Sequence, residues 1–86
     1  MKLWGNLWKN NHLLSDHVVL EESTDTRTHK IFHALDELCA HFDLGRPIWF
    51  DSNIREFKRH GHTRFYQDCF MEEIPFDYLE IRILEE

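Results

Sequence analysis

The chain has 86 residues and a formal net charge of −6, and 42% of its residues are hydrophobic. This length suits one domain over residues 1–86 with a single apolar core, and two cysteines are too few for a disulfide framework. The acidic balance disfavours general nucleic-acid binding, which depends on neutralising phosphates. No apolar run has the length of a signal peptide core or a membrane span, so we expect a cytoplasmic protein without membrane contact.

The first predicted elements are two strands. Residues 2–9 alternate between two faces, and residues 12–20 return as the second strand. Asn10 and Asn11 lie between them, and this pair suits a two-residue hairpin turn because asparagine tolerates positive φ. Closing the hairpin there sets two pairs of residues opposite each other, Trp8 with Leu13 and Leu7 with Leu14.

The clearest predicted element is a helix over about residues 28–42. Its apolar residues recur at a spacing of three or four, which places them on one helical face: Ile31, Leu35, Leu38 and Phe42. Asp25, Thr26 and Thr28 are each able to cap its N-terminus. Gly45 is expected to supply the left-handed conformation that ends it.

The second half of the chain predicts shorter elements. Asp51 and Ser52 compete as caps of a short helix that ends at Gly61. A strand precedes this helix and two strands follow it, over residues 47–50, 62–70 and 76–84. The order along the chain is ββαβαββ. Short turns between neighbouring strands predict an α+β fold, in which one main helix packs on one face of a small, mostly antiparallel sheet.

Three stretches carry a resemblance to other proteins: TRTHKIFHAL at 26–35, IWFDSN at 48–53 and TRFYQD at 63–68. They are similar to stretches of short, functionally uncharacterised bacterial proteins of about this length, and the likeness extends over nearly the whole chain. The resemblance implies a bacterial, cytoplasmic protein. It assigns no activity and no site residue.

Histidines raise the possibility of a metal site. His29 and His33 are four residues apart on the predicted helix, and Glu37 extends the same stripe. Two imidazoles and a carboxylate can hold zinc with one open position. The alternative is that these side chains form the solvated face opposite the apolar one, and we favour that interpretation because the glutamate placement of a metalloprotease helix is missing.

No motif predicts catalysis. Cys39 lies on the apolar side of the predicted helix, and Cys69 has no neighbouring base, so both cysteines are interpreted as structural. The sequence contains no nucleophile elbow, phosphate loop or dinucleotide fingerprint. We therefore expect a non-catalytic protein that requires no cofactor.

A basic segment is the second candidate site. Between positions 55 and 64 the cationic residues outnumber the acidic ones, and they could bind nucleic acid or another anion: Arg55, Lys58, Arg59, His60 and Arg64. The alternative is that these charges pair with the acidic C-terminal strand or stay solvated. We favour the alternative, because the surrounding acidity opposes phosphate attraction.

The surplus of aromatic residues is the third candidate. One main helix covers one face of a sheet, so some large side chains are expected on the other face: Trp4, Trp8, Leu13, Trp49, Tyr66 and Tyr78. Exposed tryptophan and tyrosine are typical of protein interfaces. The alternative is that the short second helix and the loops cover these side chains, and the sequence favours neither interpretation over the other. The leading hypothesis is therefore a protein-interaction module, whose partner is another protein or a second copy in a homodimer.

Overall fold

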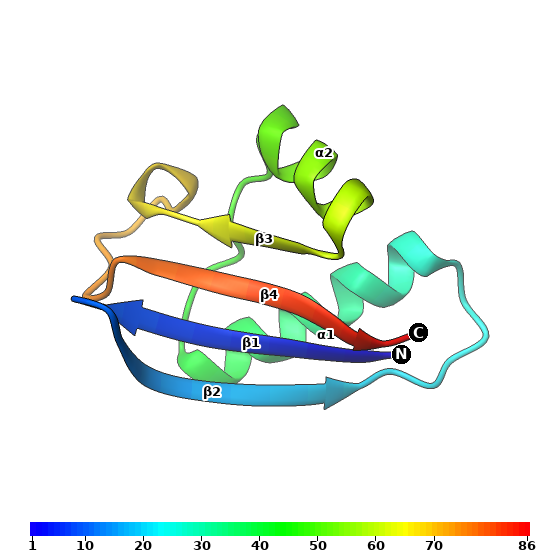
Figure 1. Ribbon diagram of the computed structural model, residues 1–86. Helices are drawn as coiled ribbons and strands as arrows, with labels where there is room; N and C mark the ends of the chain where they lie inside the picture. The colour runs from blue at the N-terminus through cyan, green and yellow to red at the C-terminus, as the bar shows by residue number, and fades with distance from the viewer.

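The computed structural model describes residues 1–86. It contains a four-stranded antiparallel sheet and two α-helices, which confirms the predicted α+β fold with one main helix on the sheet. The elements in chain order are β1 (Lys2–Lys9), β2 (His12–Leu20), α1 (Arg27–Phe42), α2 (Asp51–His60), β3 (His62–Phe65), the 3-10 turn η1 (Gln67–Cys69) and β4 (Tyr78–Glu85). The strand order in space is β2-β1-β4-β3, so the N- and C-terminal strands lie side by side at its centre (Figure 1).

The β1–β2 hairpin turns at Asn10 and Asn11, which have φ angles of 51° and 64°. The expected pairing of Trp8 with Leu13 is confirmed. The expected pairing of Leu7 with Leu14 is wrong, because Leu7 faces Ser15 and the register shifts between Leu7 and Trp8. Leu14 is thus the extra residue of a β-bulge, a local irregularity that alternation alone does not reveal.

Helix α1 is fixed at both ends by local hydrogen bonds. Thr26 is its N-cap, and the Thr26 side chain accepts the backbone N–H of His29 at 3.2 Å. The helix ends at Asp43, which has a left-handed φ of 58°. The predicted cap at Gly45 is therefore wrong: aspartate also tolerates this conformation, and the Gly45 N–H instead donates to the Glu72 carboxylate at 2.9 Å.

The segment before α2 differs from its prediction. Residues 47–50 form no strand, and the order along the chain is therefore ββααββ. Pro47 offers no N–H to a ladder, and the Ile48 N–H donates to the carbonyl of Cys69, outside the sheet, at 2.7 Å. The segment connects α1 to α2 while β3 takes the edge position beside β4.

The strand predicted over residues 62–70 ends earlier, at Phe65. The chain then turns through η1, where the Gln67 side chain supplies the hydrogen bonds that a strand partner would otherwise provide. Its Nε2 donates to the carbonyl of Glu72 at 2.8 Å, and its Oε1 accepts the N–H of Ile74 at 2.9 Å.

The core lies between the sheet and α1. Sixteen buried apolar residues form one cluster, and Leu35 and Leu38 of α1 are fully buried in it. The helix passes close to β1 at Gly5, where a Cβ atom would lie 2.9 Å from the methyl groups of Leu38. We call the side of the sheet that α1 packs against the covered face. Neither helix combines the length and apolar composition needed to cross a membrane.

Candidate functional site

The side of the sheet opposite α1 carries no helix, because α1 lies behind the sheet and α2 lies beyond the β3 edge (Figure 1). We call this side the open face. It consists of Leu13, Asp16 and Val18 from β2, Trp4, Asn6 and Trp8 from β1, Tyr78, Glu80 and Arg82 from β4, and His62, Arg64 and Tyr66 from β3 and the residue that follows it. Alternation places these residues together, since successive side chains of a strand point to opposite faces.

The two tryptophans of the open face are held by hydrogen bonds. The Trp8 Nε1 donates to the Asn6 Oδ1 at 2.5 Å, and the Trp4 Nε1 donates to the Asp16 Oδ2 at 2.9 Å. Asn6 is 1% exposed, and its Nδ2 has no hydrogen-bond partner. The indoles are therefore fixed in place above the sheet, and one buried donor between them remains unpaired.

A charged network lies beside the tryptophans. The buried carboxylate of Glu80 accepts the Arg64 Nε at 3.0 Å, and the Arg82 Nη2 lies 3.6 Å from its other oxygen. The Arg64 guanidinium also lies 4.6 Å from the centre of the Tyr78 ring, which is 5.3 Å from the Tyr66 ring. The hydrogen bond to Glu80 raises the pKa of Arg64, so this cation remains charged at any physiological pH.

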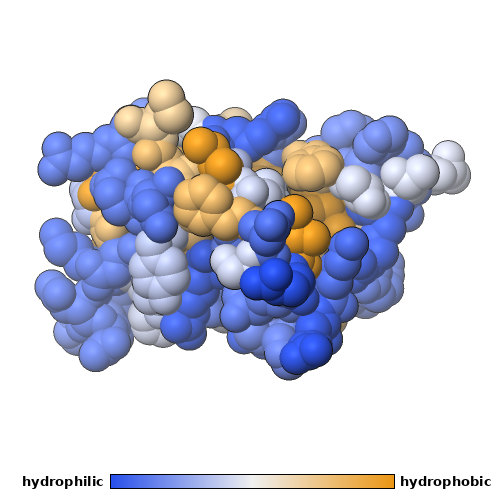
Figure 2. Space-filling model, turned by 90° about the horizontal axis from the view of Figure 1, so that it is seen from above, coloured by the Kyte–Doolittle hydropathy of each residue, from blue (hydrophilic) through white to orange (hydrophobic).

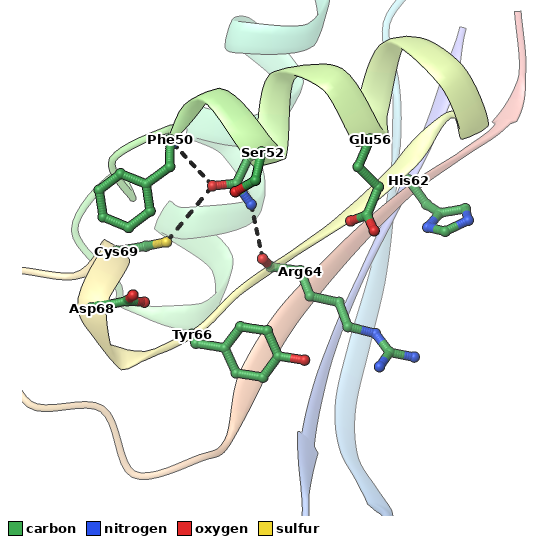
Figure 3. Close-up of a pocket in the computed structure, with 9 residues that line it drawn as sticks. Phe50, Ser52, Glu56, His62, Arg64, Tyr66, Asp68 and Cys69 are labelled. Carbon is green, nitrogen blue, oxygen red and sulfur yellow. Dashed lines mark hydrogen bonds between the residues drawn. The ribbon is translucent and has the colours of Figure 1, made fainter.

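A hollow of about 350 Å³ adjoins the open face between α2 and β3. In Figure 3, Ser52 and Glu56 project from α2, Arg64 lies on β3 below them, and Tyr66 directly follows that strand. The other residues that line the hollow are Phe50, Asn53, His62, Asp68 and Cys69.

Asn53 forms the structural base of this hollow and is 7% exposed. Its Nδ2 donates to the Thr63 hydroxyl at 2.9 Å and to the Arg64 carbonyl at 3.0 Å. Its Oδ1 accepts the Phe50 N–H at 3.0 Å and lies 3.9 Å from the Cys69 sulfur. These bonds join the start of α2 to β3 and η1, and they leave the amide no free group for a ligand.

The thiols do not supply a nucleophile. Cys69 is buried, and the loss of hydration raises its pKa. Burial likewise raises the pKa of Cys39 to about 11. Both thiols are therefore neutral near pH 7, whereas nucleophilic attack requires the thiolate.

The structure brings together most of the large side chains that the sequence analysis predicted for the exposed face of the sheet. Trp4, Trp8, Leu13, Tyr66 and Tyr78 share the open face. Trp49 lies elsewhere: its ring packs edge-on against Phe57, Phe65 and Phe32, on the side of the core. Trp49 precedes a helix instead of belonging to a strand, so alternation could not assign its face.

The basic segment is divided between two places. Its members on α2 surround an open hollow that also includes Glu56: Arg55, Lys58, Arg59 and His60. None of these four forms an ion pair in the structure. Arg64 instead lies on the open face and pairs with Glu80. The five cationic residues thus do not form one surface.

The histidine stripe lies on the exposed side of α1. The His29 and His33 rings are 6.4 Å apart, and the His29 Nδ1 lies 3.0 Å from the Asp25 carboxylate. Glu37 does not join them: no group of three or more His, Cys, Asp or Glu side chains is placed to share a metal ion.

Sequence reasoning missed Asn6, Asp16 and Glu80 as members of the open face. Asn6 shares its strand face with Trp4 and Trp8, so alternation contained the signal for this residue. The places of Asp16 and Glu80 depend on the register of three strands, which the sequence does not show.

No protein-family model matches the chain, and no curated protein or solved structure is significantly similar to it. The resemblance to short bacterial proteins therefore stays a prediction. What the site can do follows from its chemistry: fixed indoles, a tyrosine pair and paired charges are suited to binding.

Proposed function

We propose that this chain is a non-catalytic interaction module that binds a second copy of itself through the open face. The main observation in support of this proposal is that Trp4 and Trp8 lie on the helix-free side of the sheet with their indoles fixed by hydrogen bonds. Side chains that are already ordered lose little entropy on binding. Tryptophan, tyrosine and arginine are also the residues most enriched among those that dominate binding energy.

Exposed apolar residues extend this surface to the β2 edge. Leu13 and Val18 on the open face are each 45% exposed, and Leu14 and Leu20 of the same strand are 53% and 56% exposed. β2 is an edge strand of the sheet, so these side chains lie at the rim of the open face, where a second copy packed over that face can cover them.

Charge favours a second copy as the partner. The chain as a whole carries −6 and would repel itself, but the open face is balanced. Asp16 and Glu80 offset Arg64 and Arg82. Two copies related by a twofold axis parallel to the strands would place β2 of one over β3 of the other, and Asp16 would then face the cationic side.

We place the protein in the cytoplasm and assign it no catalytic role. Both cysteines are free and buried, as expected where thiols stay reduced. The only buried carboxylate of the open face, Glu80, is engaged by two arginines and is not available as a general base.

Sedimentation equilibrium from micromolar to millimolar concentration tests this function. We expect a concentration-dependent dimer that added salt does not dissociate, because apolar burial drives the contact. Val18→Glu should weaken the dimer, and so should Trp4→Glu. Met71→Glu is the matched control, since Met71 is 88% exposed and lies outside the open face.

Circular dichroism checks the folding of each variant. If Trp4→Glu unfolds, Val18→Glu still tests the proposal, because Val18 is already exposed and its replacement should leave the fold intact. A protein that remains monomeric at millimolar concentration would contradict the proposal. So would a dimer that Met71→Glu weakens as much as Val18→Glu does.

A further inference from the structure

The two edges of the sheet differ in whether a further strand can reach them. At the β3 edge, α2 packs alongside the strand, and the buried Asn53 amide donates to the Arg64 carbonyl at 3.0 Å. Figure 2 looks onto this side of the molecule, where apolar side chains form an interrupted band between hydrophilic ones. At the opposite edge, no helix or strand lies beyond β2 (Figure 1). The β2 edge is therefore the open one.

Backbone hydrogen bonds identify which groups of β2 point outward. The Glu21 N–H donates to the Met1 carbonyl at 2.8 Å, and the Met1 amino group donates to the Glu21 carbonyl at 3.0 Å. Bonded and non-bonded pairs alternate along an antiparallel ladder, and the register is regular from this pair back to Ser15. The N–H and C=O groups that point away from β1 therefore belong to Asp16, Val18 and Leu20.

The β2 edge also lacks the usual features that prevent pairing with another chain. Its outward backbone groups form no hydrogen bond within the protein. Natural edge strands are commonly short or carry lysine or proline, whereas β2 has nine residues and contains neither. The bulge at Leu14 disturbs only the end next to the hairpin turn, so residues 15–20 remain a regular template for a further strand.

Charge indicates which kind of strand this edge can accept. No lysine or arginine occurs between Lys9 and Arg27, whereas four acidic residues do: Asp16, Glu21, Glu22 and Asp25. Lys30 of α1 offsets part of the charge of Glu21, and the remainder stays negative. A second copy would bring the same acidic residues to this edge, and like charges across a strand pair are destabilising. A basic strand instead meets opposite charge, which favours its binding.

We propose that the β2 edge binds a basic, extended segment of another protein, which adds to the sheet as a fifth strand. Main-chain hydrogen bonds to the outward groups supply affinity, and alternate side chains supply selectivity. The segment is apolar beside Val18 and Leu20, which are 45% and 56% exposed. It carries lysine or arginine at its ends, which complements Asp16 and Glu22. The site lies in the plane of the sheet, so it is distinct from the open face and does not depend on the proposed dimer.

Nuclear magnetic resonance with the synthetic peptide Lys-Lys-Val-Thr-Val-Thr-Val-Lys-Lys tests the proposal. The peptide should slow the exchange of three backbone amide hydrogens with solvent, because they become hydrogen-bonded: those of Asp16, Val18 and Leu20. The amides of His17 and Val19 already donate to β1 and should change far less. The protein is kept at a concentration at which sedimentation shows a monomer, so the result does not depend on whether the open face self-associates.

Modified peptides separate the contributions of charge and backbone. Replacing the four lysines by glutamate should weaken binding about tenfold at low salt, and the difference should shrink as salt rises. Methylating the backbone nitrogens of the three valines, which point toward β2 when the valine side chains lie beside Val18, should also weaken it about tenfold. Methylating those of the two threonines is the matched control, because these nitrogens point away from β2.

A variant of the protein places the peptide at this edge. Leu20→Lys adds a cation there and should raise the Kd of the lysine peptide about threefold. Leu84→Lys is the matched control, since Leu84 is 51% exposed and lies on β4, two strands away from β2.

Three results would overturn the proposal. One is equal binding of the lysine and glutamate peptides, and another is an equal effect of the two methylation patterns. The third is slower exchange of the outward amides at higher protein concentration without peptide, because a second copy of the chain would then occupy the edge.

Discussion

The two faces of one sheet differ in how their side chains are held. On the covered face, Leu3, Leu79 and Ile81 are fully buried and contact other apolar residues. On the open face, the alternate residues of the same strands are held by directed bonds, such as those of Trp8 to Asn6 and Arg64 to Glu80. The first face therefore supplies most of the folding free energy, whereas the second keeps large side chains ordered at the surface.

The largest expected effect is on the covered face. Leu38→Ala should lower the free energy of unfolding by about 2–5 kcal/mol, because Leu38 is fully buried and truncation leaves a cavity. Val18→Ala on the open face should cost less than about 1 kcal/mol, since Val18 is 45% exposed. Urea titration of both variants measures this difference, and equal costs would mean that the two faces are equally important for stability.

Adding atoms at the covered face should have the next largest effect. Gly5→Ala should destabilise the protein by about 1–3 kcal/mol, because the new methyl group would lie 2.9 Å from the methyl groups of buried Leu38. Ser15→Ala is the control, as Ser15 lies on the neighbouring strand and is exposed. A Gly5→Ala variant with unchanged thermal unfolding would show that α1 is not packed tightly on β1.

A smaller effect should separate two tryptophans. Trp8→Phe leaves the buried Asn6 Oδ1 without its donor, whereas Trp49→Phe removes a donor that had no partner. Since the two substitutions remove the same atoms, Trp8→Phe should cost about 1 kcal/mol more than Trp49→Phe. Chemical denaturation provides the comparison, and the reverse order would indicate that the Trp49 Nε1 is hydrogen-bonded.

The smallest expected effect is a loss of stability that occurs only at alkaline pH. Burial raises the pKa of Cys39 from 9.0 to about 11, so the folded state keeps a proton that the unfolded state loses. This contribution to stability is fully present below about pH 9 and is lost as pH rises toward 11. Cys39→Ala should therefore flatten the fall of the melting temperature between these values, and an unchanged pH profile would contradict the assignment.

Local patterns in the sequence predicted the parts of the fold that local physics determines. Positive φ at Asn10 and Asn11 located the hairpin, and the spacing of Leu35 and Leu38 located the buried side of α1. The β-bulge at Leu14 escaped prediction because it depends on how β2 fits β1 along its whole length.

The candidate site was predictable in part for a similar reason. Trp4 and Trp8 could be placed on one face by alternation within a single strand. The Arg64–Glu80 pair joins residues of β3 and β4, whose register is a property of the assembled sheet. Trp49 was predicted to lie with the exposed aromatic residues, but it packs in the core. Its core neighbours Phe32 and Phe65 are distant in sequence, so the sequence pattern did not reveal this contact.

The few buried side chains that attach α2 to the rest of the protein affect how easily this helix moves. Only two of its side chains are buried, Asn53 and Phe57, so its release would expose little apolar surface. Elements of this kind open at a lower free energy than the core, and their amide hydrogens exchange sooner. The same helix forms one wall of the hollow beside β3 and one wall of a groove between α2 and α1. A single displacement of α2 therefore changes the width of both cavities at once, and a ligand that fixes α2 in one of them also sets the shape of the other.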